Sequence, residues 1–328
     1  MADVAVTGAT GFIGSSVVRL LLDQKRSVRA LIEPGANTKN LDGLNVERVT
    51  VDVCDTKAMQ KALSGCETLY HLAAIYRTWL PDREVIYRVN VEGTVATLLA
   101  AQNAKVKRTV YTSSIAAVGL IEGQLADETT PFNLFDVAND YILTKWQSER
   151  VAMRFAESGM NLTVVNPAFP FGPRDIAPTP TGKIILGVLH GEVPGVFPGG
   201  ICTIDVDDCA MGHLLAEEKG KVGERYILGN DNVTLKEFFQ LVAKVGNVRS
   251  PVLPLPGALG QAIAFGMEAW ADNVSHSEPS ATYKAARYAM RTAHFSNAKA
   301  KRELGLKTRP IEESVKRAID WFRENGMV

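Results

Sequence analysis

The stretch VAVTGATGFIG, residues 4–14, passes from a short apolar run into three glycines, and the amphipathic segment IGSSVVRLLLDQ overlaps its end at residues 13–24. Glycine is required where a chain turns tightly, where backbone approaches a phosphate and where a helix packs closely on a strand. The free N–H groups at a helix start favour anions. We therefore predict a strand, a dinucleotide-binding turn and a helix, although such a turn also occurs without a ligand. The residues expected to face the dinucleotide are Gly8, Thr10, Gly11, Phe12, Ile13 and Gly14.

Outward from this turn, short apolar runs alternate with helical patterns, which is typical of a parallel α/β sheet. We expect an α/β fold with a Rossmann-type doubly wound sheet. Its strands are predicted at residues 4–6, 28–32, 47–51, 68–72, 108–112 and 162–165, with helices at 13–24, 56–63, 89–103 and 141–157.

After Pro167 the pattern changes, because residues 167–200 hold seven of the fifteen prolines. A short helix is expected near 183–190, and strands at 203–206 and 225–228 are expected to return to the main sheet. Thr234 and Glu237 form a capping-box pattern before a helix at 235–245, and residues 311–325 form a last helix. We predict a dinucleotide-binding domain at 1–166 with returning segments near 203–229. A smaller substrate-binding domain would hold 167–202 and 230–328.

Composition limits the function. Lys plus Arg and Asp plus Glu both number 36, which argues against nucleic acid or a polybasic membrane contact as partner. The four cysteines show no zinc-ligand spacing, so no metal is expected. The chain opens on a predicted strand, so we expect a cytoplasmic protein.

Residues 251–271 are apolar but broken by prolines, glycines and Glu268. They predict a buried or amphipathic helix rather than stable membrane insertion, with lipid contact as the alternative.

Acidic residues follow two of the predicted strands. Glu33 stands 19 residues after Gly14, where a carboxylate binds the ribose hydroxyls and repels a 2′-phosphate. This favours NAD over NADP, unless Glu33 is only a solvated loop residue. Asp52 and Val53 would lie at the adenine edge, unless Asp52 belongs to a surface turn.

Tyr141 and Lys145 are spaced four residues apart and therefore share one face of the predicted helix. A neighbouring ammonium lowers the pKa of a phenol, which would make Tyr141 a proton-transfer group. Such a pair also occurs by chance on solvated helix faces. Ser113 and Ser114 end a predicted strand, where their hydroxyls either meet the reacting oxygen or cap the next turn.

The motifs TGATGFIG, Asp52-Val53, HLAA (71–74), TSSIAAVG (112–119) and Tyr141-x-x-x-Lys145 occur in this order. Together they resemble the extended short-chain dehydrogenase/reductase superfamily over nearly the whole chain. Within it the chain is most similar to dihydroflavonol-4-reductase-like proteins and the hopanoid-associated sugar epimerase group. YRVNVEGT (87–94), NPAFPFGPRD (166–175) and PTPTG (178–182) support this resemblance.

The resemblance implies that Ser114, Tyr141 and Lys145 are catalytic and that Lys145 also binds the nicotinamide ribose. It implies that Asn90 helps to order the lysine. The further cofactor contacts that it implies are Leu72, Ala73, Ala74, Pro167 and Phe169. Dihydroflavonol-type reductases usually carry an arginine that binds the NADP phosphate where Glu33 stands. Its absence weakens the interpretation of the chain as an NADPH-dependent reductase.

Three functions remain open from the sequence. The first is an NAD(P)-dependent oxidoreductase that interconverts a secondary alcohol and a ketone. The second is a nucleotide-sugar epimerase or dehydratase with tightly held NAD, and the third is a non-catalytic nucleotide sensor. Aromatic residues expected over the nicotinamide favour an apolar or aryl substrate, although many of them will be core; they are Tyr76, Trp79, Phe132, Phe135, Phe169, Phe171 and Phe197. Arg77 and Arg174 leave an anionic substrate possible.

We also expect a homodimer through helices 89–103 and 141–157, with Leu98 and Val151 facing outward.

Overall fold

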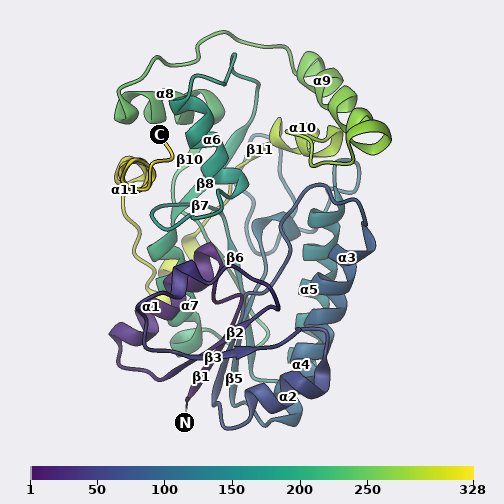
Figure 1. Cartoon of the computed structure of the whole chain (residues 1–328), viewed down its shortest axis with the longest axis vertical. Helices are drawn as coiled ribbons and strands as arrows, with labels where there is room; N and C mark the ends of the chain where they lie inside the picture. The colour runs from purple at the N-terminus through teal and green to yellow at the C-terminus, as the bar shows by residue number, and fades with distance from the viewer. Residues whose placement is uncertain (1) are drawn as a thin grey trace.

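The computed structural model describes residues 2–328, and its centre is a sheet of seven parallel strands (Figure 1). The strand order is β3-β2-β1-β4-β5-β6-β9, so the order reverses beside β1. Ligands of such sheets bind outside the carboxyl ends of the strands at this reversal. The strands are β1 (Val4–Thr7), β2 (Val28–Ile32), β3 (Glu47–Thr50), β4 (Thr68–His71), β5 (Arg108–Thr112), β6 (Leu162–Pro167) and β9 (Arg225–Leu228). The predicted Rossmann-type α/β fold is confirmed.

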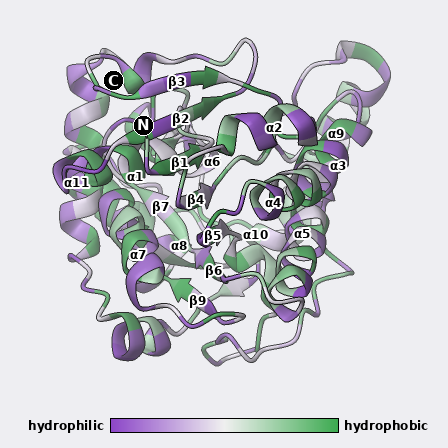
Figure 2. Ribbon diagram, turned by 90° about the horizontal axis from the view of Figure 1, so that it is seen from below, coloured by the Kyte–Doolittle hydropathy of each residue, from purple (hydrophilic) through white to green (hydrophobic). Residues whose placement is uncertain are grey.

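Helices cover both faces of this sheet, as Figure 2 shows. On one face α1 (Phe12–Asp23) packs against α7 (Val206–Lys219), and on the other α4 (Gly93–Asn103) packs between α2 (Thr56–Leu63) and α5 (Asp140–Glu157). The single helix expected at 89–103 is divided into the π-helical turn η2 (Arg88–Glu92) and α4, and the short helix α3 (Glu84–Tyr87) precedes them. Leu98 is fully buried in the core on this face rather than outward-facing as expected, because it packs toward the sheet.

A smaller unit lies over the carboxyl ends of the strands (Figure 1). Its four strands are β7 (Phe169–Phe171), β8 (Gly200–Asp205), β10 (Asn232–Thr234) and β11 (Thr292–Ala293). They pack with helices α6 (Pro180–Leu189), α8 (Leu235–Gly246) and α11 (Ile311–Glu324) around a separate apolar core. The predicted capping box of α8 is present in both of its hydrogen bonds.

The strand expected at 203–206 does not return to the main sheet. β8 instead pairs with β7, β10 and β11 in the smaller sheet, and the place beside β6 is taken by β9. Residues 206–219, which directly follow β8, form α7 on the main sheet. The chain therefore crosses between the two units at Asp205.

The apolar segment 251–271 forms helix α9 (Gly257–Trp270), which a proline-rich loop precedes and which packs on α10 (Tyr283–Ala289). Of the two expectations for this segment, a buried or an amphipathic helix, the buried one is wrong, since Ala264 is the one buried residue of α9. The large side chains that it exposes are Leu259, Ile263, Phe265, Met267 and Trp270. Across residues 2–328 no helix has both the length and the apolar character that crossing a membrane requires.

Candidate active site

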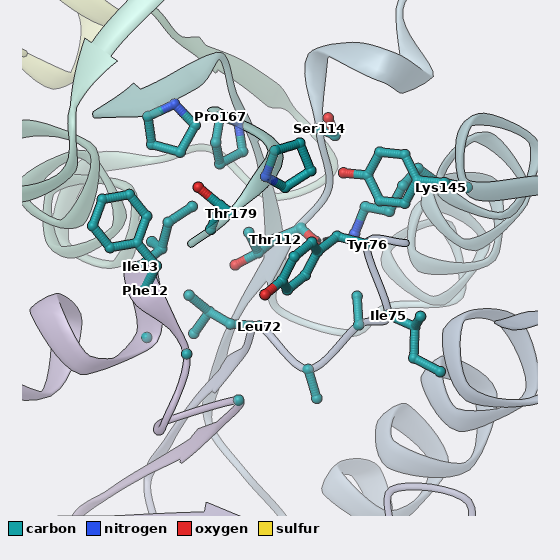
Figure 3. Close-up of a pocket in the computed structure, with 18 of the residues that line it drawn as sticks. Phe12, Ile13, Leu72, Ile75, Tyr76, Thr112, Ser114, Lys145, Pro167 and Thr179 are labelled. Atoms are coloured by element: carbon teal, nitrogen blue, oxygen red, sulfur yellow. Dashed lines mark hydrogen bonds between the residues drawn. The ribbon is translucent and has the colours of Figure 1, made fainter. Parts of the chain in front are cut away.

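A cavity of about 560 Å³ opens at the carboxyl ends of the central strands, between the sheet and the smaller unit (Figure 3). It extends from the ends of β2 and β3 to the start of α5. The structure brings to its wall every residue for which a cofactor contact was predicted: Gly8, Thr10, Gly11, Phe12, Ile13, Gly14, Glu33, Asp52, Val53, Leu72, Ala73, Ala74, Tyr141, Lys145, Pro167 and Phe169. Ser114 lines the same cavity.

The glycine turn has a shape that no larger residue fits. Gly8 has φ +65°, and a Cβ there would lie 2.9 Å from the backbone nitrogen of Ala73. A Cβ on Gly14 would lie 2.0 Å from the carbonyl oxygen of Gly8. Gly11 caps α1 without a side chain, so the N–H groups of the first helical turn remain available to an anion. This cradle fits a dinucleotide pyrophosphate.

Thr7 fixes the wall opposite the glycine turn. Its hydroxyl oxygen accepts hydrogen bonds from the backbone N–H groups of Leu72 and Ala73, at 3.0 and 3.1 Å. The same hydroxyl lies 2.8 Å from Nδ1 of His71. Burial lowers the pKa of His71 to about 3, and the nearby Lys145 adds to this, so the imidazole is neutral. The backbone after β4 is thereby held against the cofactor cavity.

Arg174, which leaves an anionic substrate possible, lines the cavity and is anchored by residues of α1 and α7. Its guanidinium forms an ion pair with Asp207 and donates a hydrogen bond of 3.1 Å to Oγ of Ser16 in α1. Its carbonyl oxygen accepts a bond of 3.2 Å from Nδ2 of Asn40. Ser16 and Asp207 therefore hold this side chain beside α1, the helix that follows the glycine turn.

Ser114 and Tyr141 meet at the other end of the cavity. Ser114 caps the short helix η3 (Ile115–Ala117), where its Oγ accepts a hydrogen bond of 3.1 Å from the N–H of Ala116. The capping role considered for this hydroxyl is therefore present, and the same hydroxyl also hydrogen-bonds Tyr141. Oγ of Ser113 is buried and has no hydrogen-bond partner among residues 2–328. Asn139 caps α5 through the N–H of Ile142 and so sets the position of Tyr141.

Lys145 is buried one turn beyond Tyr141, and its Nζ donates a hydrogen bond of 2.8 Å to the carbonyl oxygen of Thr112. Burial lowers the pKa of Lys145 to about 8, while Glu149 on the next turn opposes this shift. Burial raises the pKa of Tyr141, and the hydrogen bond from Ser114 offsets the rise in part. The pKa of Tyr141 is therefore raised in this structure and not lowered as expected, because burial is the dominant cause. A protonated phenol suits donation of a proton to a carbonyl oxygen.

Asn90 organises the region next to Lys145 without touching it. Its Oδ1 accepts a bond of 2.7 Å from the N–H of Ile75, and its Nδ2 donates to the carbonyl oxygen of Ile75 at 2.8 Å. Nδ2 also lies 3.0 Å from Oγ1 of Thr144. Asn90 thus joins the loop after β4 to α5.

Most of the aromatic residues expected over the nicotinamide lie elsewhere. Tyr76 and Phe169 line the cavity, but Trp79 does not, because its indole N–H donates a bond of 2.8 Å to Asp272. Phe132 and Phe135 pack on Trp146, and Phe171 packs on Phe238 in the core of the smaller unit. The sequence alone does not show in which direction these aromatic side chains point.

Several lining residues were absent from the sequence-based site. Among them are Asn37, Asn40, Ile75, Thr112, Thr179, Thr181 and Tyr288. Thr179 carried a local signal, since it precedes Pro180 and caps α6 through the N–H of Gly182. No local sequence signal points to Tyr288, because only the tertiary fold brings α10 to the cavity.

The fold and the cavity are those of a dinucleotide-dependent enzyme, and a serine, a tyrosine and a lysine lie together in the cavity. The model of the NAD dependent epimerase/dehydratase family matches residues 4–229, and the chain belongs to this family.

Two curated relatives match over the whole chain. A Synechocystis protein provisionally named dihydroflavonol 4-reductase is 38% identical over 98% of this chain and 95% of its own. Sterol demethylase protein B of Methylococcus capsulatus is 34% identical over 98% of this chain and 99% of its own. Among solved structures, gox2253 is 40% identical with a TM-score of 0.89, and each chain is covered completely. UDP-glucose 4-epimerase of Thermotoga maritima, 22% identical over 98% of this chain and 99% of its own with a TM-score of 0.78, shares the fold.

Proposed function

We propose that this protein is an NAD-preferring oxidoreductase that interconverts a secondary alcohol and a ketone on a largely apolar or aryl small molecule. Ser114, Tyr141 and Lys145 form its catalytic triad. The smaller unit, residues 167–202 and 230–328, supplies the substrate side of the cavity. The names of the reductase relatives support the reaction class.

The observation that carries this proposal is the scarcity of positive charge in the cavity. Among residues 2–328, Lys145 and Arg174 are the cationic residues that line it. Lys145 is hydrogen-bonded to Thr112, and Arg174 is paired with Asp207 at the cofactor end. A nucleotide sugar brings a second diphosphate, which calls for free cations or helix N-termini. The catalytic end therefore suits an uncharged substrate better.

Apolar groups surround the catalytic hydroxyls. Ala116, Ile142, Ala168 and Phe169 line this part of the cavity together with Ile75. Walls of this kind bind apolar or aryl groups by removing their surface from water, and the few polar groups orient the ligand. This supports an apolar body attached to the reacting carbon.

In the proposed reduction, Tyr141 donates its phenolic proton to the substrate oxygen while Ser114 holds that oxygen by a hydrogen bond. A nicotinamide dinucleotide bound in this cavity would supply the hydride that reduces the carbonyl carbon. The positive charge of Lys145 stabilises negative charge that develops on the phenol oxygen, and Lys145 also binds the nicotinamide ribose. In the oxidation Tyr141 accepts the proton of the alcohol.

Glu33 supports the choice of NAD. It lines the adenosine end of the cavity and is exposed, so its carboxylate is free to bind ribose hydroxyls and repel a 2′-phosphate. Asp52 lies beside it, and its Oδ1 accepts a bond of 2.9 Å from the N–H of Cys54. The neighbouring carboxylates oppose a phosphate in the same place.

Turnover with defined probes tests the proposal. Purified protein is mixed with NAD and a panel of aliphatic and aryl secondary alcohols, and NADH formation is followed by absorbance; the reverse reaction uses ketones with NADH. We expect turnover of apolar members of the panel and none of UDP-glucose. Conversion of UDP-glucose to its epimer, with NAD that stays bound through desalting, would instead establish the epimerase alternative.

We also propose a homodimer through α4 and α5. Leu99 on α4 is exposed, and Val151 on α5 is half-buried, so apolar surface remains for a partner. A two-fold arrangement would bury this surface against its own copy.

A further inference from the structure

Tyr288 reaches the catalytic end of the cavity from the smaller unit. It lies near the end of α10 and packs with Tyr141 against the buried cluster of Ala116, Ala138 and Ile142. It lines the cavity together with Ser114 and Tyr141. A residue far along the chain thus places a second phenol next to the first.

The hydroxyl of Tyr288 has no hydrogen-bond partner in the part of the chain that the structure describes. Its oxygen is buried, and no group among residues 2–328 forms a hydrogen bond with it. Burial raises the pKa of Tyr288, and the neighbouring Tyr141 raises it further, so the group remains a neutral donor. Leaving a buried hydroxyl unpaired is unfavourable, and an unpaired group that lines a binding cavity points to a ligand that satisfies it.

The reacting oxygen is not available to Tyr288. A carbonyl oxygen has two lone pairs, and the proposed function assigns them to Ser114 and Tyr141. A third donor at the same end of the cavity requires another acceptor. Because the two phenols are neighbours, that acceptor must be close to the reacting carbon.

We infer that Tyr288 determines specificity by donating a hydrogen bond to a second substrate oxygen, carried by the carbon next to the reacting one. This inference rests on the proposed alcohol and ketone chemistry. The preferred substrates are then α-hydroxy ketones and the matching vicinal diols, with an apolar body. A simple ketone leaves the Tyr288 hydroxyl unpaired in the complex, and such a site discriminates against the analogue that lacks the oxygen.

The test compares α-hydroxyacetophenone with acetophenone, which differ by one hydroxyl group. We expect unmodified protein to show a higher kcat/KM for α-hydroxyacetophenone. Tyr288→Phe removes only the phenol oxygen and should reduce the ratio of the two kcat/KM values about 10–100-fold, mainly through KM. Tyr283→Phe on the same helix is the matched control, because Tyr283 contacts Phe265 and Arg287 outside the cavity. It should leave the ratio as it is.

Two results would overturn the inference: equal kcat/KM values for both ketones in unmodified protein, or a ratio that Tyr288→Phe does not change. Calorimetric binding of both ketones to the NAD-loaded protein separates this from failure of the proposed function. If neither ketone is turned over but Tyr288→Phe selectively weakens binding of α-hydroxyacetophenone, the Tyr288 contact stands and the reaction assignment fails. If both ketones bind equally well to both proteins, the Tyr288 contact is wrong.

Discussion

The ammonium nitrogen of Lys145 lies 2.8 Å from the carbonyl oxygen of Thr112, and this contact ties helix α5 to the end of strand β5. Oγ1 of Thr112 in turn lies 3.0 Å from Nε2 of His213 on α7. The lysine is thus connected through one strand residue to the helix on the opposite face of the sheet. Its position follows from the fold and is fixed before a substrate binds.

The buried position of Lys145 predicts a pH-dependent affinity for NAD. Burial lowers the pKa of Lys145 to about 8, so its ammonium is present below that pH and is lost as the pH rises through it. Because the ammonium is expected to bind the nicotinamide ribose, the Kd for NAD should rise between about pH 7 and pH 9. Fluorescence titration across this range measures it. Lys145→Ala should bind NAD more weakly and lose this pH dependence; an unchanged dependence in the variant would exclude Lys145 as its source.

Glu33 predicts the preference between the two cofactors. The carboxylate should make NAD bind more tightly than NADP, and Glu33→Arg should narrow or reverse the ratio, since arginine binds phosphate. Titration of both cofactors against both proteins decides this. Glu122→Arg, an exposed position outside the cavity, controls for the change of charge. Tighter binding of NADP than of NAD to the unmodified protein would contradict the assignment.

Two buried histidines predict a loss of stability in acid. Burial lowers the pKa of His71 to about 3 and that of His213 to about 4, against 6.5 for the free side chain. Below pH 6.5 the unfolded chain therefore binds protons that the folded protein does not, so stability is complete above this pH and falls below it. For each histidine, the free energy of unfolding should decrease by about 1.4 kcal/mol for every pH unit below 6.5.

Urea unfolding from about pH 7 to pH 5 measures the slope. His213→Asn should reduce the slope by about one histidine's share. His276→Asn, at an exposed left-handed residue, should keep the full slope. An unaltered slope in the His213 variant would contradict the neutral, buried assignment.

The proposed dimer is tested by mass in solution. Light scattering at micromolar concentration should give twice the chain mass of 35.6 kDa. Val151→Glu on α5 should shift the protein toward monomer, because a charge would be buried in the interface. Val222→Glu, on an exposed loop, is the control. A monomeric mass for the unmodified protein would contradict the proposal.

The first half of the fold was predictable because its signals are local. Gly8 and Gly14 occupy positions that a Cβ would block, and the strands on either side are short apolar runs between helices. The capping box of α8 is likewise a contact between residues three apart. Local features of this kind can be predicted directly from the sequence.

The substrate side was not predictable, because long-range contacts decide it. Asp272 holds Trp79 outside the cavity, and Asp207 forms an ion pair with Arg174 at the cavity wall; both partners are remote in the sequence. β8 has the composition of a main-sheet strand but finds its partners in the smaller sheet. Tyr288 enters the cavity from a helix whose pattern gave no sign of it.

Proton transfer by Tyr141 is the central claim, and Tyr141→Phe tests it most directly. This variant removes the phenol oxygen and keeps the ring that packs beside Ile142. On any ketone that the unmodified protein reduces, kcat should fall about 10²–10⁴-fold, while the Kd for NAD, measured by fluorescence, should change by less than about twofold. Tyr283→Phe should retain full turnover. If Tyr141→Phe keeps more than half of the turnover, the triad and the mechanism built on it are wrong.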